Sequence, residues 1–155
     1  MLGARGFDVT GIDPSEEGVA FARERCPKAT FEVATGYEDL AGRFGRFPVV
    51  ICTEVIEHCY YPKRLAKTFF DLIEPEGLGV MTAPYHGYIK NLAISVTGKW
   101  DRHFGALNDG GHIKFFSTKT LLSVLNEVGF TDISFHYAGR VPPLAKSMIA
   151  VVRKQ

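Results

Sequence analysis

Short apolar runs alternate with longer stretches of helical spacing along this chain, and the alternation recurs from one end to the other. A short run rich in β-branched residues is typical of a strand, and apolar residues three or four positions apart are typical of a helix. A repeated order of strand, helix and strand needs crossover connections, which join parallel strands. The sequence therefore predicts an α/β fold with a mostly parallel sheet.

The expected elements follow this pattern. The expected strands are residues 7–12, 30–34, 49–52, 78–83, 131–137 and 147–152. The run 49–52 is continuously apolar, which is typical of a strand buried on both faces. Ser15 and Ser117 are expected to cap helices, a further helix is expected over 62–73, and a turn is expected at 75–77.

Composition limits what such a fold can do. The chain has 155 residues, 46% of them hydrophobic, so a single domain over 1–155 can bury a substantial core. Its formal net charge of +1 gives no broad electrostatic reason to bind nucleic acid or an anionic membrane. No stretch approaches the roughly 18 apolar residues of a membrane span, and residues 1–10 lack the order of a secretory signal. We expect a cytoplasmic protein that binds neither nucleic acid nor a membrane.

One long segment lacks a clean period. Residues 85–111 are rich in glycine, aromatic residues and histidine, and His112 closes the segment. An irregular stretch of this length inside a compact domain is typical of a functional loop. Its side chains suit a pocket that closes over a planar substrate, although each aromatic residue alone is better explained by core packing. We expect a lid or substrate loop at about residues 84–112.

Asp13 follows the first expected strand, at the mouth of a parallel sheet. A carboxylate there can accept two hydrogen bonds from the vicinal hydroxyls of a ribose. The same side chain can instead cap the next helix. From Asp13 alone, both interpretations stand.

A second candidate site is the run of residues 54–58, Glu-Val-Ile-Glu-His, directly after the strand at 49–52. If the run turns helically, Glu54, Glu57 and His58 share one face at the carboxyl edge of the sheet. Two carboxylates and an imidazole could hold Mg²⁺ or orient one another for general-base work. The alternative is a helix N-terminus that favours acids, with His58 bonded to the following loop.

Five segments, taken in order, resemble class I S-adenosylmethionine-dependent methyltransferases, in the branch of the ubiquinone-biosynthesis O-methyltransferases. They are residues 8–15, residues 50–58, residues 75–78, His112 with 116–117, and residues 128–130. Together they span nearly the whole chain, and their order and spacing make the resemblance specific. It implies a Rossmann-like methyltransferase fold, with a mostly parallel sheet and an antiparallel strand at its C-terminal end. It also implies methyl transfer from S-adenosylmethionine to a small-molecule acceptor, with oxygen as the expected acceptor atom.

The resemblance implies a role for each matching residue. Asp13 would bind the ribose hydroxyls of S-adenosylmethionine, residues 36–38 would flank the adenine, and residues 52–54 would lie near the methionine end. The residues expected to bind the cofactor are Asp13, Pro14, Ser15, Gly36, Tyr37, Glu38, Cys52, Thr53 and Glu54.

Some relatives use such an acidic segment and a later histidine to hold a divalent metal. Glu54, Glu57, His58 and His112 match that pattern, so they are the expected ligands of a bound Mg²⁺. Methyl transfer from a sulfonium depends mainly on alignment and exclusion of water, so a base is helpful rather than obligatory. If a base is used, His58 and His112 are the expected catalytic residues.

Two departures from the family pattern matter. Pro48 stands where the family usually has Asp, which removes a hydrogen bond. The chain also begins inside the family's first helix, at residues 2–6, without the first strand and its Gly-rich loop. That strand lies in the middle of the family's sheet, so its absence leaves unpaired backbone on two central strands unless they close up or another chain fills the gap. We therefore expect an N-terminally truncated form that is poorly stable, homo-oligomeric or weakly active.

Two other functions remain open. A nicotinamide-dependent oxidoreductase uses an acid after the second strand in the same way, although nothing in the second half of the chain favours it. A non-catalytic methyltransferase-like module is favoured by the truncation and by Pro48, whereas Asp13 and the 54–58 run speak against it. Cofactor affinity distinguishes the three.

Overall fold

The chain folds into two units, one up to Glu38 and one from Asp39 onward, and each is described by itself. The computed structural model describes residues 5–155. Most of the segment matched above to the family's first helix, residues 2–4, lies outside the described residues. None of the helices in this described part is long and apolar enough to cross a membrane.

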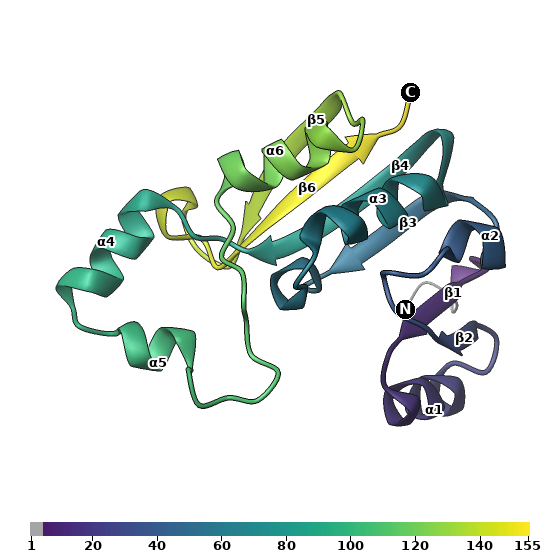
Figure 1. Cartoon of the computed structure of the whole chain (residues 1–155), viewed down its shortest axis with the longest axis horizontal. Helices are drawn as coiled ribbons and strands as arrows, with labels where there is room; N and C mark the ends of the chain where they lie inside the picture. Colours follow the sequence, from purple (N-terminus) through teal and green to yellow (C-terminus); the bar gives the residue numbers. More distant parts are fainter. Residues whose placement is uncertain (1–4) are drawn as a thin grey trace. The chain divides into compact units, whose positions relative to one another are not determined.

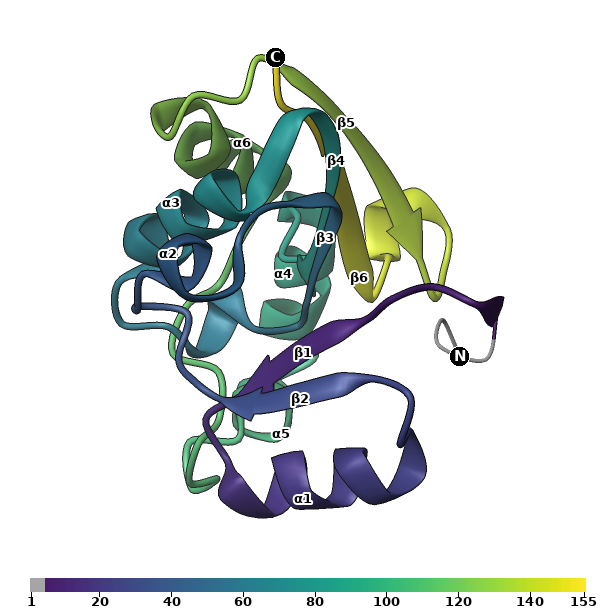
Figure 2. The ribbon, with the colours of Figure 1, turned by 90° about the vertical axis from the view of Figure 1, so that its right-hand side faces the viewer.

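The first unit is a strand, a helix and a second strand (Figure 1). Strand β1 (Thr10–Asp13) pairs in parallel with β2 (Thr30–Val33), and α1 (Glu16–Arg25) connects them and lies along one face of the pair (Figure 2). The Ser15 side chain caps α1 by accepting a 3.0 Å hydrogen bond from the Gly18 amide, as expected. Strand β1 is shorter than predicted and begins three residues later.

The second unit contains a four-stranded sheet in the order β3-β4-β6-β5. Strand β3 (Phe47–Thr53) runs parallel to β4 (Ile73–Pro84), whereas β6 (Ser147–Arg153) runs antiparallel to both β4 and β5 (Asp132–Ala138). The expected α/β fold, with parallel strands and an antiparallel strand at the C-terminal end, is therefore confirmed. Among the described residues, β1 pairs only with β2 and β3 only with β4.

Helices cover one face of this sheet. Helices α3 (Pro62–Leu72) and α6 (Thr118–Glu127) lie on the same face in Figures 1 and 2, with the shorter α2 (Leu40–Phe44) beside α3. The predicted stripe of α3 is buried at Leu65, Ala66 and Phe69. Ser117 begins α6 with a capping box, so this predicted cap is also confirmed.

Two expectations about the second unit were wrong. The turn predicted at 75–77 is instead part of β4, because a register shift after Phe47 and a left-handed Glu76, at φ +62°, absorb the irregularity. The predicted burial of β3 on both faces fails, since Val49 and Ile51 are each 52% exposed.

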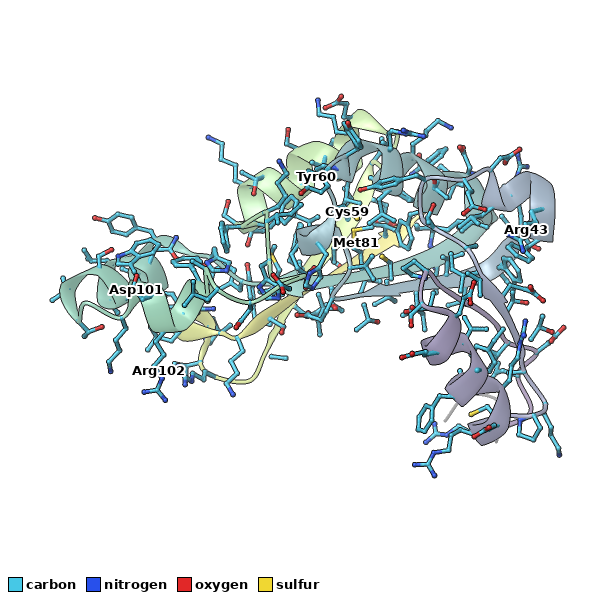
Figure 3. All side chains as sticks on the ribbon, turned by 60° about the horizontal axis from the view of Figure 1, so that its bottom comes forward. Arg43, Cys59, Tyr60, Met81, Asp101 and Arg102 are labelled. Atoms are coloured by element: carbon cyan, nitrogen blue, oxygen red, sulfur yellow. The ribbon has the colours of Figure 1, made fainter. Side chains whose placement is uncertain are left out.

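The segment predicted as an irregular loop contains two helices, α4 (Tyr88–Val96) and α5 (Trp100–Phe104). They extend beyond the end of β4 (Figure 1), and the side chain of Arg102 points outward from α5 (Figure 3). No residue of either helix is buried. The local sequence therefore forms helices without the apolar, core-facing stripe that makes a helix recognisable in a sequence.

Candidate functional site

In the first unit, the predicted cofactor-binding residues gather at the carboxyl edge of β1 and β2. Asp13 ends β1 opposite Val33 of β2, and the Ala34 amide donates a 3.2 Å hydrogen bond to the Asp13 carbonyl. The turn at 36–38 follows β2 directly, so it shares this edge with Asp13. The topology of one βαβ unit therefore places Asp13 and this turn at the same edge, and their role in binding a cofactor stays a prediction.

The Asp13 side chain has a local structural role as well. Its Oδ1 accepts a 2.8 Å hydrogen bond from the Ser15 amide, which fixes the exit from β1 into α1. The exposed carboxylate still has a second oxygen, Oδ2, with which to accept from a ligand. Both interpretations of Asp13, capping and ligand binding, are thus compatible with its geometry. Beside it lies a pocket of about 220 Å³, whose lining includes Gly11, Asp13 and Phe31.

The turn after β2 is held by its own side chains. The Thr35 amide donates a 2.7 Å hydrogen bond to Glu38 Oε1, and the Tyr37 amide donates a 3.4 Å hydrogen bond to Thr35 Oγ1. These bonds give the turn a defined shape at the sheet edge. A carboxylate and an aromatic ring are therefore presented on a fixed backbone.

In the second unit, Cys52, Thr53 and Glu54 lie where β3 ends. Glu54 has a left-handed backbone, at φ +52°. Its amide donates a 3.0 Å hydrogen bond to Thr82 Oγ1, and that hydroxyl donates a 2.9 Å hydrogen bond back to Glu54 Oε1. Burial raises the pKa of the Cys52 thiol to about 12, with Cys59 and Glu57 adding to the effect, so Cys52 is a neutral thiol rather than a nucleophile.

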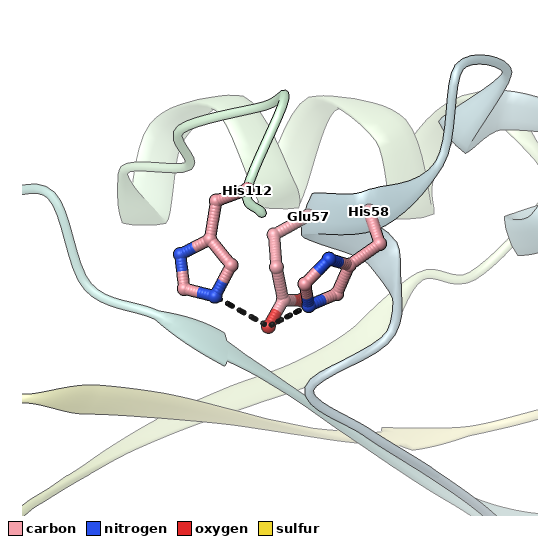
Figure 4. Close-up of side chains that lie close together, drawn as sticks. All are labelled: Glu57, His58 and His112. Carbon is pink, nitrogen blue, oxygen red and sulfur yellow. Dashed lines mark ion pairs between the residues drawn. The ribbon is translucent and has the colours of Figure 1, made fainter. Parts of the chain in front are cut away.

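A buried carboxylate and two imidazoles meet beyond this strand (Figure 4). Glu57 and His58 belong to a short 3₁₀ helix, η2 (Ile56–His58), and His112 comes from the segment that follows α5. Glu57 Oε1 lies 4.0 Å from Nε2 of His58 and 3.9 Å from Nε2 of His112. The two rings are 4.8 Å apart in an edge-to-face arrangement.

The Glu57 carboxylate lacks the partners that a buried charge needs. Its side chain is 1% exposed, and neither oxygen has a hydrogen-bond partner among the described residues. Burial raises the pKa of Glu57 above its usual value, and the Glu54 carboxylate adds to the effect, whereas its backbone amide and His58 oppose it. Burial also lowers the pKa of His112, as does His58, so the neutral ring is favoured. A buried carboxylate without a hydrogen-bond partner among the described residues, beside two imidazoles, is a group of side chains that could hold a cation.

The tautomer of His58 supports this conclusion. Its Nδ1 lies 2.9 Å from the Gly110 carbonyl oxygen, which can only accept, so Nδ1 carries the proton. In the neutral ring, Nε2 is then an unprotonated acceptor aimed at Glu57. The alternative considered for His58, a bond to a following loop, is correct, and it orients the ring for ligation rather than excluding that role.

The structure separates one predicted metal ligand from the others. Glu54 was expected to share a helical face with Glu57 and His58, but only residues 56–58 turn helically, and the Glu54 carboxylate bonds Thr82. The group that could hold a metal ion is therefore Glu57, His58 and His112. Thr82 was missed: it lies near the end of an expected strand, but only the pairing of β3 with β4 brings it beside Glu54.

The aromatic residues predicted for the lid pack on one another. His86 stacks on Phe104 at 5.7 Å and lies edge-to-face with Phe115 at 5.0 Å. Trp100 stacks on Phe104 at 4.5 Å. This aromatic cluster joins α5 to the two ends of the segment. His86 is buried in it, whereas Trp100 and Phe115 stay 42% and 45% exposed, so these rings pack on one another rather than in the core.

His86 makes the aromatic cluster sensitive to acid. Burial, with smaller effects from Lys90, His103 and His112, lowers the pKa of His86 to about 4, while its contact with Asn91 opposes the shift. A lowered pKa gives stability that is complete above the unfolded value of 6.5 and is lost as pH falls towards 4. We expect this loss to reach about 3 kcal/mol.

Substituting Phe for His86 tests that linkage. The ring is kept but cannot be protonated, so the free energy of unfolding of His86→Phe should fall less than that of the wild type between pH 6.5 and 4. Urea denaturation at a series of pH values measures the difference. The control is His136→Phe on the exposed face of β5. Parallel pH profiles for His86→Phe and the wild type would contradict the assignment.

Comparisons with known proteins fit this geometry. A family model described as a methyltransferase domain matches residues 1–134. The ubiquinone biosynthesis O-methyltransferase of Psychrobacter arcticus is 27% identical over 147 residues, which is 88% of this chain and 56% of that protein. The protein of the same name from Caulobacter sp. K31 is 33% identical over 97 residues, which is 60% of this chain and 38% of that protein. This chain thus spans about half or less of these relatives.

A solved structure shows the same fold. Magnesium protoporphyrin IX methyltransferase from Synechocystis, with S-adenosylhomocysteine bound, aligns with 99% of this chain and 67% of its own at a TM-score of 0.70 and 17% identity. An identity this low supports the fold and carries no residue roles. Together, the family match and this likeness confirm the Rossmann-like architecture.

Proposed function

Because the chain belongs to the methyltransferase domain family, we propose that it transfers a methyl group from S-adenosylmethionine to an oxygen atom of a small-molecule acceptor. The observation that carries this proposal is the site beyond the end of β3, where a buried carboxylate and two imidazoles, that of His112 with a lowered pKa, can bind and deprotonate a hydroxyl. The names of the curated relatives support oxygen as the acceptor atom.

In the first unit, Asp13 is the proposed ribose-binding residue. Its carboxylate stands at the carboxyl end of a parallel strand, where ligands of such sheets bind. The turn at 36–38 shares that edge and is the proposed neighbour of the adenine. In the second unit, Cys52, Thr53 and Glu54 stay predicted neighbours of the methionine end.

The proposed chemistry needs one proton acceptor. The acceptor oxygen attacks the methyl carbon, the carbon–sulfur bond breaks, and its electron pair stays on the sulfur of S-adenosylhomocysteine. The hydroxyl proton passes to His112 Nε2, which is free to take it because burial lowers the pKa of this ring. Exclusion of water and alignment of the acceptor supply the rest.

We also propose a divalent cation site at Glu57, His58 and His112. The unpartnered carboxylate and the Nε2 acceptor of His58 fit a cation. One carboxylate and two imidazoles suit Mn²⁺, Co²⁺ or Zn²⁺ better than Mg²⁺, which prefers oxygen ligands. A bound cation would act as a Lewis acid that favours the ionised acceptor. An Nε2 that coordinates a metal cannot also take a proton, so His112 serves in one role or the other.

Calorimetric titration of S-adenosylhomocysteine tests the function. We expect saturable binding with a dissociation constant in the micromolar range, and none for NAD⁺ as the control ligand. Binding of NAD⁺ instead would favour an oxidoreductase. Absence of both, in a chain folded by circular dichroism, would favour the non-catalytic module.

Glu57→Gln should change cation binding and stability in opposite directions. The amide carries no charge and can donate to an imidazole Nε2, so at pH 7 we expect stabilisation by about 1–2 kcal/mol. Because the pKa of Glu57 is raised, the wild type loses stability as pH rises from the unfolded value of 4.5 through the folded one, and the advantage of Gln grows over that window. Thermal melts at several pH values measure it, and Glu74→Gln, on β4, is the control.

Binding of MnCl₂ should at the same time be lost in Glu57→Gln, because the only anionic donor of the three is gone. If Glu57→Gln were less stable than the wild type at every pH, the Glu57 carboxylate would already have hydrogen-bond partners in the protein without a cation.

A further inference from the structure

The segment that follows α5 is attached to η2 by several hydrogen bonds. His58 Nδ1 donates to the Gly110 carbonyl at 2.9 Å and lies 3.3 Å from that of Gly111. The amides of Ile113 and Lys114 both donate to the Glu57 carbonyl, each at 2.9 Å. We call residues 110–116 the return segment, since they lead the chain back from α5 to α6.

The return segment also pairs with the end of β4, at the point where the chain leaves the sheet for α4 and α5. Tyr85, at the end of β4, forms a parallel bridge with Phe116, and the His86 amide donates a 2.9 Å hydrogen bond to the Phe116 carbonyl. Residues 87–109, here called the lid, therefore leave and rejoin the sheet at one place. The return segment connects this place on the sheet to η2.

The three candidate ligands come from the two segments that these hydrogen bonds join, η2 and the return segment. Glu57 and His58 come from η2, whereas His112 comes from the return segment. The unpartnered Glu57 carboxylate lies between the two rings, within 4.0 Å of each Nε2. A ligand that bonds all three side chains contacts both segments at once.

We propose that a divalent cation at Glu57, His58 and His112 fastens the return segment to η2 and so sets the order of the lid. This inference rests on the cation site proposed above. Among the described residues neither oxygen of the Glu57 carboxylate has a hydrogen-bond partner, so without a cation the attachment depends on the bonds to the Glu57 carbonyl and from His58 Nδ1. With a cation, all three side chains bind the same ion, which holds the return segment against η2. His112 is then the positioning residue, because it connects the bound ion to the return segment and so to the lid.

The lid is the part of this unit that such a fastening would affect most. Neither of its helices has a buried residue, so little packing opposes local opening. Gly98, Gly105 and Gly110 all have left-handed backbones, at φ +62°, +54° and +70°. These positions separate α4, α5 and the return segment, which lets the helices move as short rigid pieces. A cation that binds only the fastened state shifts the equilibrium towards it.

Hydrogen exchange with and without MnCl₂ tests the inference, and loss of the free Mn²⁺ electron paramagnetic resonance signal measures binding in the same samples. We expect Mn²⁺ to slow amide exchange over residues 98–111 by at least about fivefold, the lower range of coupling between sites. His112→Ala should lose that protection. His136→Ala, which changes a histidine outside the cluster, should keep it.

The two measurements distinguish the inference from its premise. Mn²⁺ that binds in the wild type without slowing exchange in the lid would overturn the fastening and leave the cation site standing. Protection that persists in His112→Ala would also overturn it, because the cation would then act elsewhere. Absence of Mn²⁺ binding would overturn both.

Discussion

Asp13→Asn should weaken the binding of S-adenosylhomocysteine by about 10- to 100-fold, because charge-assisted hydrogen bonds contribute about 1.5–3 kcal/mol each. The carboxylate can accept from both ribose hydroxyls, whereas the amide can accept through one atom only. Asn retains an Oδ1 for the Ser15 amide, so the exit from β1 and the cap of α1 should survive. Isothermal titration of the ligand into the wild type and the variant measures the effect.

A matched variant controls for the loss of charge. Asp39 caps α2 by accepting a 2.9 Å hydrogen bond from the Gly42 amide, as Asp13 accepts from Ser15. Asp39→Asn therefore changes the same functional group in a similar turn, and it should leave the affinity unchanged. Equal affinity of Asp13→Asn and the wild type would mean that Asp13 serves the turn alone.

The elements that the sequence predicted well are those specified by near neighbours. Helix α3 carries its apolar stripe at regular spacing, and Ser117 caps α6 through residues three positions away. Helices α4 and α5 were missed because none of their residues is buried, so no core-facing stripe marks them. The length of β4 was missed because a register shift and one left-handed residue allow a Pro-Glu-Gly sequence inside a strand.

The candidate site divides in the same way. Asp13, Glu57 and His58 follow strands, and parallel strands end at one edge of their sheet, so their placement was predictable. Glu54 was grouped wrongly, because its positive φ and its bond to Thr82 depend on a strand 28 residues away. The meeting of His112 with Glu57 joins segments far apart in the sequence. Only the family resemblance pointed to it, and the assigned roles stay predictions.

Phe130→Ala should have the largest effect on stability. Phe130 is 1% exposed and lies directly between α6 and β5, with its ring 5.9 Å from that of Phe69 and 4.9 Å from that of Phe70. Removing a fully buried ring leaves a cavity that rigid neighbours cannot fill, which costs about 3–5 kcal/mol. Urea denaturation gives the free energy of unfolding. Phe21→Ala, whose ring is 60% exposed on α1, should change it by less than about 1 kcal/mol.

The same variant shows whether the positions of Glu57 and His58 depend on the packing of α3. Phe130 joins α3 to the β5 side of the sheet, and α3 begins four residues after η2 ends, so a loosened α3 could disturb Glu57 and His58. We expect it not to, because η2 is also held by the return segment through the Glu57 carbonyl and His58 Nδ1. Phe130→Ala should then bind Mn²⁺ as the wild type does wherever it remains folded. A fall in Mn²⁺ affinity at a temperature well below its midpoint would show that α3, and not the return segment, positions the ligands.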